Sequence, residues 1–342
     1  MDDLRNDLSP SIAATAVPDG GLTLAPADWP QLIIRAGVPA QERFLEFFAA
    51  TIRNKNTREA YFRAVCRFLK WSDERHLELE DIRPVHVAAY IEMFTTTDEQ
   101  EDGLPFSAPT VKQHLAAIKM LFDYLVTGQI VPFNPAAAVR GPRYSTKRGK
   151  TPVLTAAQAK ELIESIDTST VVGLRDQALI GLMLYSFSRV SAVVGMRVRD
   201  AFTVNRRTWI RLSEKGGKCH EVPVHHKAEE YLHAYLDSAG IREEGNSHLW
   251  RSTRGRSQRL TAKGMSRVDA YRMIQRCAAK AGMDAAMCNH TFRATGITVF
   301  LENGGAIETA AQIAAHESPR TTKLYDRRAD KIALEEIERI RL

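Results

Sequence analysis

The sequence has few cysteines, and they stand far apart. Cys66, Cys219, Cys277 and Cys288 form no CxxC pair. This spacing indicates neither a zinc site nor a disulfide framework. We therefore interpret these residues as packing thiols in a reducing compartment.

Long apolar runs are also missing. The chain has no stretch of about eighteen apolar residues, which a membrane-spanning helix requires. Its acidic start, MDDLRNDLSP, does not have the positively charged and then apolar layout of a signal peptide. The sequence shows no internal repeat and no low-complexity tract. We therefore expect a soluble, cytoplasmic protein.

The chain is long enough for two domains, and it carries a positive charge. Its 342 residues have a mass of 38.3 kDa, and the apolar share of 44% is typical of a globular protein. The net charge of +6 and the pI of about 9.1 suggest an anionic partner. Because proteins that bind no nucleic acid also show a mild excess, the distribution of the charge matters more than its sum.

The first part of the chain contains a leader and a helical domain. Residues 1–38 carry scattered Pro and Gly without sustained periodicity, which predicts a flexible leader. Residues 39–132 contain four amphipathic segments with helical spacing, which predict an all-α domain. The four segments are ERFLEFFAATI, TREAYFRAVCRFLKWSDE, RPVHVAAYIEMF and APTVKQHLAAIKMLFDYLV.

Positive residues lie at the start of two of these helices. Lys55 and Arg58 belong to NKNTRE, and Lys112 belongs to PTVKQH. At a helix start such side chains can reach DNA phosphates beside the free backbone N–H groups. The alternative, that they are only solvated charges, stays open.

Residues 133–152 have the composition of a linker. The segment FNPAAAVRGPRYSTKRGKTP is rich in proline and has five positive charges and no negative one. We expect it to be extended, to form no core and to follow a phosphate backbone. The candidate contacts are Arg140, Arg143, Lys147 and Arg148.

Residues 153–342 predict a mixed α+β domain. Thr155 is a plausible N-cap for LTAAQAKELIESI, and residues 175–196 form a long apolar stretch that we expect to be a core helix. TWIRLS and HEVPV flank a KGGK turn, which predicts a β-hairpin. Further helical segments follow, and Ile332, Leu334 and Ile337 belong to an apolar stripe in the last one.

The segment from residue 289 to residue 327 gathers side chains that suit phosphate chemistry. His290 and Arg293 stand three residues apart and share one face of a predicted helix, while His316 and Tyr325 follow in later segments. An arginine fork binds phosphate, histidine exchanges protons near neutral pH, and a phenol can act as a nucleophile. The alternative for each residue alone is a cap, a surface group or a buried ring.

Two further cations complete this set. Arg189 interrupts an apolar run, where a buried guanidinium needs an anion such as Asp200 or a bound phosphate. Lys215 lies at the hairpin turn, where glycines allow a ligand to approach closely. A structural ion pair and a solvated lysine are the alternatives.

Together, these residues make the chain resemble the tyrosine recombinase (phage integrase) family over nearly its whole length. The Arg189 stretch resembles the first-arginine motif, KGGK the hairpin lysine, HTFR the His-x-x-Arg box, and AAHESPRTTKLYDR the segment of the second histidine and nucleophile. The resemblance implies a helical, SAM-like core-binding domain and a mixed catalytic domain that close around duplex DNA. One departure is Ala192, where the family often has an acidic residue.

The resemblance also implies a mechanism. Tyr325 would attack the scissile phosphorus and form a 3′-phosphotyrosyl bond, while Arg189 and Arg293 would clamp the non-bridging oxygens. His290 would accept the phenol proton.

Two residues would complete the reaction that the resemblance implies. Lys215 would protonate the departing 5′-oxygen, and His316 would hydrogen-bond the phosphate. Lys218 is the alternative general acid. No metal and no ATP cofactor would be needed, because the phosphotyrosyl bond keeps the energy of the broken bond.

The resulting prediction is an enzyme, a site-specific DNA recombinase or integrase. Its partners would be duplex DNA with paired recognition sites, which places it at the nucleoid, and three further copies in a homotetramer. The terminal helix, residues 331–342, would dock on a neighbouring protomer. A type IB topoisomerase-like activity and a non-catalytic DNA-binding regulator are the alternatives. The sequence does not separate a mobile-element integrase from a chromosome resolvase.

Overall fold

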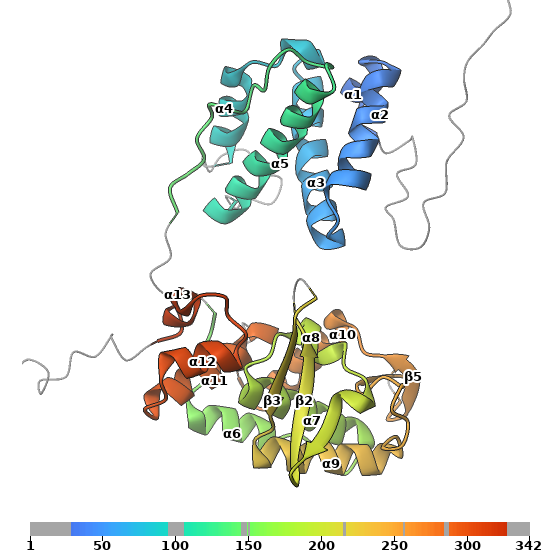
Figure 1. Cartoon of the computed structure of the whole chain (residues 1–342), viewed down its shortest axis with the longest axis vertical. Coiled ribbons are helices and arrows are strands. Elements are labelled where there is room, and N and C mark those ends of the chain that lie inside the picture. Colours follow the sequence, from blue (N-terminus) through green and yellow to red (C-terminus); the bar gives the residue numbers. More distant parts are fainter. Residues whose placement is uncertain are drawn as a thin grey trace, which may run out of the picture. The chain divides into compact units, whose positions relative to one another are not determined.

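The structure of the chain, a computed structural model, divides into two compact units. They comprise Met1–Ser145 and Thr146–Leu342, and the division lies inside the segment predicted as a linker (Figure 1). The described residues are 29–94, 106–144, 149, 151–214, 217–255, 257–283 and 287–326. Within these ranges, no helix combines the length and the apolar character that crossing a bilayer requires.

The first unit is all-helical in its described part, as predicted. The four segments with helical spacing form α2 to α5, and a short helix, α1, precedes them. The bounds are α1 (Gln31–Arg35), α2 (Val38–Glu46) with a π-helical continuation (Phe47–Thr51), α3 (Lys55–Asp73), α4 (Pro84–Met93) and α5 (Ala108–Thr127).

Local signals explain where two of these helices begin. Asn54 caps α3 by accepting the backbone N–H of Thr57 at 3.1 Å. Pro84 occupies the first turn of α4, where its missing N–H costs nothing. The apolar faces then meet in an aromatic core. The centroid of the Phe68 ring lies 5.0 Å from that of Tyr90 and 6.3 Å from that of Phe122.

The folded unit begins earlier than the sequence predicted. Helix α1 lies within the range predicted as a leader, and its Leu32 and Ile33 are fully buried. The helix is only five residues long, between Pro30 and Gly37, so no helical period could reveal it. Residues 1–28 of the predicted leader lie outside the described residues.

The first part of the predicted linker packs, contrary to expectation. Asn134 donates its amide to the Lys119 carbonyl of α5 at 2.9 Å, and the Lys119 ammonium donates to the Ala137 carbonyl. Ala136 and Val139 are buried in the helical core. The apolar residues of PAAAV therefore extend the first unit, because the neighbouring charges do not prevent their burial.

The second unit combines helices with two small antiparallel sheets, which confirms the α+β prediction. Strands β1 (Ala201–Val204), β2 (Arg207–Ser213) and β3 (Cys219–Pro223) form one sheet in that order, and β2 and β3 are the predicted hairpin. Strands β4 (Arg251–Thr253) and β5 (Leu260–Gly264) form a second sheet that the sequence analysis did not anticipate.

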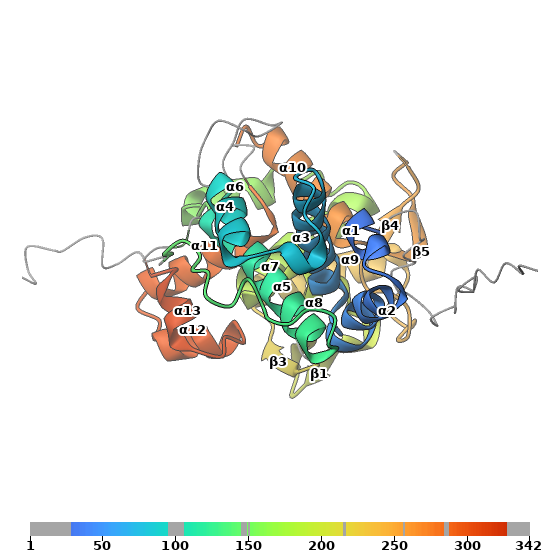
Figure 2. The ribbon, with the colours of Figure 1, turned by 90° about the horizontal axis from the view of Figure 1, so that it is seen from above.

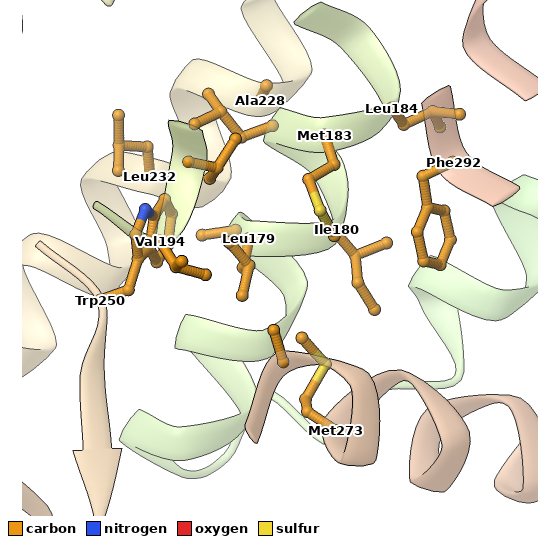
Figure 3. Close-up of a cluster of buried hydrophobic side chains, with 14 of the residues drawn as sticks. Leu179, Ile180, Met183, Leu184, Val194, Ala228, Leu232, Trp250, Met273 and Phe292 are labelled. Atoms are coloured by element: carbon orange, nitrogen blue, oxygen red, sulfur yellow. The ribbon is translucent and has the colours of Figure 1, made fainter. Parts of the chain in front are cut away.

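The helices of this unit build its main core. Figure 3 shows side chains of α7, α8, α9, α10 and α11 meeting around Ile180 and Met183, both fully buried. Thr155 caps α6 as predicted, since its hydroxyl accepts the Gln158 N–H at 3.2 Å. The helices are α6 (Ala156–Glu164), α7 (Val171–Ser186), α8 (Val190–Val194), α9 (His226–Ala239), α10 (Arg267–Lys280), α11 (Asn289–Glu302), α12 (Ile307–Ile313) and α13 (Pro319–Lys323).

Candidate functional site

Arg293 is the buried centre of the site. Its residue is 2% exposed on α11, and its guanidinium donates to two main-chain carbonyls, those of Phe187 and, at 2.7 Å, Ala314. Helix α11 comes this close to α7 because Gly296 faces it, where a Cβ would collide with the Leu184 carbonyl oxygen. Burial lowers the pKa of Arg293 to about 10, so the group is still charged at neutral pH.

Arg189 follows a break in the predicted core helix. The apolar stretch does not continue as one helix, because Phe187 has a left-handed backbone (φ 52°) and ends α7. Arg189 is the extended N-cap residue of α8, and its side chain is 32% exposed. Its anion is Glu214 at 2.5 Å, whereas Asp200, the partner considered from sequence, accepts the Arg197 backbone N–H at 2.7 Å.

His316 and Tyr325 lie together where the chain leaves α12 and α13. Their rings are nearly parallel, 8° apart in plane, with centroids 6.0 Å apart. The Thr322 hydroxyl hydrogen-bonds with His316 Nδ1 at 2.8 Å, and the Thr298 hydroxyl of α11 donates to the Tyr325 carbonyl at 3.0 Å. Two threonines therefore fix the imidazole and the backbone that carries the phenol.

The end of the linker also lies against this segment. Gly149 donates its N–H to the Leu324 carbonyl at 2.9 Å, one residue before Tyr325. Helices α12 and α13 lie side by side in both views (Figure 1 and Figure 2). The nucleophile candidate is thus held by contacts from α11, α13 and residue 149.

Both histidines are neutral bases near neutral pH. Burial, together with the charges of Arg293 and Arg189, lowers the pKa of His316 to about 4. His290 is exposed, yet desolvation by the surrounding chain lowers its pKa, and the same two arginines add to the effect. A neutral imidazole can accept a proton or a hydrogen bond, which a protonated one cannot.

The hairpin contacts the same region, although its tip is outside the described residues. Lys215, the predicted general acid, lies in that undescribed part. Lys218 pairs with Glu317 at 3.1 Å, and both side chains are exposed. His220 hydrogen-bonds with the Ile313 carbonyl at 3.1 Å. These contacts tie β3 to the end of α12, beside His316.

The structure therefore brings together five of the six predicted catalytic side chains. Arg189 and Arg293 influence the titration of His290 and His316, and Tyr325 acts on that of Arg293. Two guanidiniums, two neutral imidazoles and a phenol provide anion binding, proton acceptance and a nucleophile without further groups. Among the described residues, no cluster of three His, Cys, Asp or Glu side chains could hold a metal ion.

The predicted DNA-contacting residues differ in availability. Lys55, Lys112, Arg140 and Arg143 are exposed. Arg58 is not wholly free, because its Nε donates to the Ile52 carbonyl at 2.9 Å and closes the junction before α3. Lys147 and Arg148 lie outside the described residues, as does the predicted terminal helix, residues 331–342.

The sequence analysis missed three residues that shape the site. Glu214 had a usable signal, an acidic residue directly before Lys215 in a hairpin that must approach Arg189. Thr298 and Thr322 gave no signal, because only the fold aligns their hydroxyls with the Tyr325 segment.

Comparison with known proteins gives a consistent result. Residues 152–331 match the family model of the phage integrase family, and residues 41–130 match that of the phage integrase N-terminal SAM-like domain. The tyrosine recombinase XerD of Mycobacterium leprae is 30% identical over 281 residues, which cover 79% of this chain and 86% of that protein. The tyrosine recombinase XerC of Chlamydia muridarum is 31% identical over 220 residues, which cover 64% of this chain and 67% of that protein.

Solved structures share the fold. A post-cleavage complex of the site-specific recombinase XerH on a palindromic difH substrate has a TM-score of 0.66 at 20% identity, covering 83% of this chain and 79% of that one. A lambda integrase dimer bound to a COC′ core site has a TM-score of 0.64 at 18% identity, covering 86% and 79%. At these identities the likeness concerns the fold alone.

Proposed function

The chain belongs to the phage integrase family of tyrosine recombinases, whose reaction is site-specific DNA recombination, and we propose that Tyr325 performs its strand cleavage. In this proposal the Tyr325 oxygen attacks the scissile phosphorus, a 3′-phosphotyrosyl bond forms, and the bond to the 5′-oxygen breaks. A 5′-hydroxyl from a second strand then reverses the step. Because the phosphotyrosyl bond retains the energy, the reaction uses neither ATP nor a metal ion.

The observation that carries this proposal is the environment of the phenol. The Tyr325 ring lies against His316 and near the buried guanidinium of Arg293, which two carbonyls hold in place. A rigid cation beside the attacking oxygen stabilises charge as it builds on the phosphate, without reorganising during the reaction. Such preorganisation suits phosphoryl transfer better than simple DNA binding.

The other side chains take complementary roles in this proposal. Arg189 and Arg293 bind the non-bridging oxygens. A phenol has a pKa of about 10 and needs a base at neutral pH, and neutral His290 accepts its proton. His316, also neutral, donates a hydrogen bond from its ring N–H to the phosphate, and Lys215 protonates the leaving 5′-oxygen.

The proposed partner is duplex DNA, bound by a homotetramer at the nucleoid. Lys55, Lys112, Arg140 and Arg143 supply exposed cations for phosphate contacts. We propose that the apolar stripe of residues 331–342 docks on the neighbouring protomer. Deleting residues from 329 onward should leave single-site binding nearly intact but reduce cooperative assembly in gel-shift titrations, and full cooperativity in the truncated protein would contradict this part.

Covalent trapping tests the central proposal. A nicked suicide substrate, which loses the 5′-hydroxyl needed for religation, should leave the wild type attached to DNA through boiling in detergent. Tyr325→Phe removes one oxygen, so folding and DNA affinity should change little while covalent capture disappears. Peptide mapping should place the DNA on residues 321–327, and capture should persist in excess EDTA.

Two outcomes would contradict the assignment. A Tyr325→Phe protein that still becomes attached would move the nucleophile to another tyrosine. A wild type that binds its site but never becomes attached would leave only a DNA-binding regulator on the same scaffold. Covalent capture together with relaxation of supercoiled DNA but no exchange between two sites would indicate the topoisomerase-like activity.

A further inference from the structure

Glu214 makes a contact to the site that its position in the sequence does not explain. Its Oε2 lies 2.5 Å from Arg189 Nη1. Glu214 directly follows β2, while Arg189 precedes α8, so the pair joins two elements that are 25 residues apart in sequence. Fully exposed ion pairs contribute little to stability, but this pair is partly buried.

The exposure of the two partners is unequal. The Glu214 side chain is 5% exposed and the Arg189 side chain is 32% exposed. A buried carboxylate is costly unless a partner compensates it, so Glu214 is positioned to hold its arginine. Within the described part of the chain, the Arg189 guanidinium hydrogen-bonds only through Nη1. Its remaining N–H groups are therefore left for an incoming anion.

The Glu214 backbone is fixed independently of this pair. Its N–H donates to the Lys218 carbonyl at 2.8 Å, and its carbonyl accepts the Gly217 N–H at 3.3 Å. Glu214 therefore closes the hairpin turn that contains Lys215. Two backbone hydrogen bonds thus hold the residue whose carboxylate contacts the longer arginine side chain.

The site also needs a negative charge. Arg189 and Arg293 are close enough for the charge of Arg189 to oppose that of Arg293, and Glu214 acts in the opposite direction on Arg293. Ala192, two residues into α8, is buried and offers no charge of its own. Among the described acidic residues, Glu214 is the one that contacts one of these two arginines, Arg189.

From these contacts we propose that Glu214 is a positioning residue for strand cleavage, which orients Arg189 toward the scissile phosphate and offsets the repulsion between the two arginines. The inference rests on the proposed function, since it concerns the same site. Glu214 touches no reacting atom in this account and acts through Arg189. Its removal should therefore slow the chemical step while leaving DNA affinity largely unchanged.

The test compares Glu214→Gln with a matched control. Glu221→Gln also removes a carboxylate from the hairpin, but from an exposed pair with Arg211 in which both side chains are nearly half exposed. Single-turnover covalent capture should slow by about 10- to 100-fold in Glu214→Gln, as misplacement of a catalytic group does. Glu221→Gln should remain within about twofold of the wild type, because exposed pairs contribute little.

A second substrate separates orientation from general damage. A methylphosphonate at the scissile position replaces one anionic oxygen by a methyl group, so the reaction depends less on two guanidiniums. We expect the ratio of the phosphate rate to the methylphosphonate rate to be lower in Glu214→Gln than in the wild type by about tenfold or more. Tenfold is the low end of the slowing expected for a misplaced group. If Glu214→Gln does not fold, Glu214→Asp, which keeps the charge on a shorter side chain, should show the same direction of change.

Each other result overturns the inference. Equal slowing on both substrates would assign Glu214 a merely structural role. The same conclusion would hold if Glu214→Gln lowered the melting temperature and the loss of rate matched that loss of stability. Faster cleavage would mean that Glu214 competes with phosphate for Arg189. A wild type that forms no covalent product would instead refute the proposed function, so the two failures are distinguishable.

Discussion

The two units fill their interiors differently. The first has an aromatic core, and Ser72 is its only buried polar residue within the described part, with its hydroxyl donating to the Phe68 carbonyl at 3.0 Å. Among its described residues, the second unit buries four charged residues and several hydroxyls. The charged ones are Arg175, Asp176, Glu214 and Arg293.

This difference shows that the second unit contains buried charges, which are unfavourable for stability, at the candidate site. Burying a charge is unfavourable unless hydrogen bonds or an opposite charge compensate it. At the site, Arg293 meets this condition by donating to two main-chain carbonyls, and Glu214 meets it by pairing with Arg189. Arg175 and Asp176 meet it elsewhere, since Arg175 also donates to the Arg251 carbonyl at 2.7 Å. Buried charge alone therefore does not identify a site, and the proposal for Arg293 rests on its closeness to Tyr325 as well.

The largest expected effect comes from the charged interior. In the proposed mechanism Arg293→Ala removes a donor to the developing charge, which should slow covalent capture by about 10²–10³-fold. It also leaves the carbonyls of Phe187 and Ala314 without this partner, which should cost about 1–3 kcal/mol of unfolding free energy. Single-turnover trapping and denaturant melts measure the two effects.

Arg276→Ala is the matched control for this variant. The Arg276 side chain is 59% exposed and its Nη2 lies 3.6 Å from Asp176 Oδ2, so its loss should change trapping little. Equal trapping by Arg293→Ala and the wild type would remove Arg293 from the mechanism.

The aromatic interior should respond in stability alone. Phe68 is fully buried among rings, and Phe68→Ala should lower the unfolding free energy of the first unit by about 3–5 kcal/mol. Phe133→Ala, at a ring that is 38% exposed, should have a much smaller effect. Denaturant titration followed by a probe in each unit would detect this. A simultaneous loss from the second unit would show that the two interiors are not independent.

Acid should weaken both units through one histidine each. Burial lowers the pKa of His114 and of His316 to about 4, below the unfolded value of 6.5. As the pH falls from about 6.5 to about 4, the unfolded chain binds protons that the folded chain does not, so this contribution to stability is lost across that window. The unfolding free energy of the wild type should fall more steeply there than that of His114→Asn or His316→Asn. If the unfolding free energies of the wild type and of a variant fell in parallel with pH, that histidine would not be the source of the acid sensitivity.

The smallest expected effect concerns two cations of the first unit. Lys112→Ala should weaken binding similarly on all DNA sequences and flatten the slope of log affinity against log salt by about 0.9, for one lost phosphate contact. Arg58→Ala should also lower stability, because it loses the Ile52 carbonyl. An unchanged slope in Lys112→Ala would exclude its phosphate contact.

Sequence patterns predicted the elements that have a period or a turn signal. Helices α2 to α5 and the β2–β3 hairpin followed from spacing, and Thr155 followed from capping chemistry. The Phe187 break did not follow, because a left-handed residue other than glycine is held by tertiary contacts and leaves no mark in the local sequence. The pairing of Arg189 with Glu214 was missed although Glu214 stands directly before Lys215, because only the folded hairpin brings the two residues together.

The hydrogen bond between Gly149 and Leu324 joins two main-chain groups. Exchanging side chains leaves such a bond in place, and only proline at position 149 would remove its donor. Substitutions of the charged residues before Gly149 would therefore leave this main-chain bond in place. On the proposed function, such substitutions would change the affinity for the DNA backbone and keep the contact beside Tyr325, so binding strength and the placement of the proposed nucleophile can vary separately.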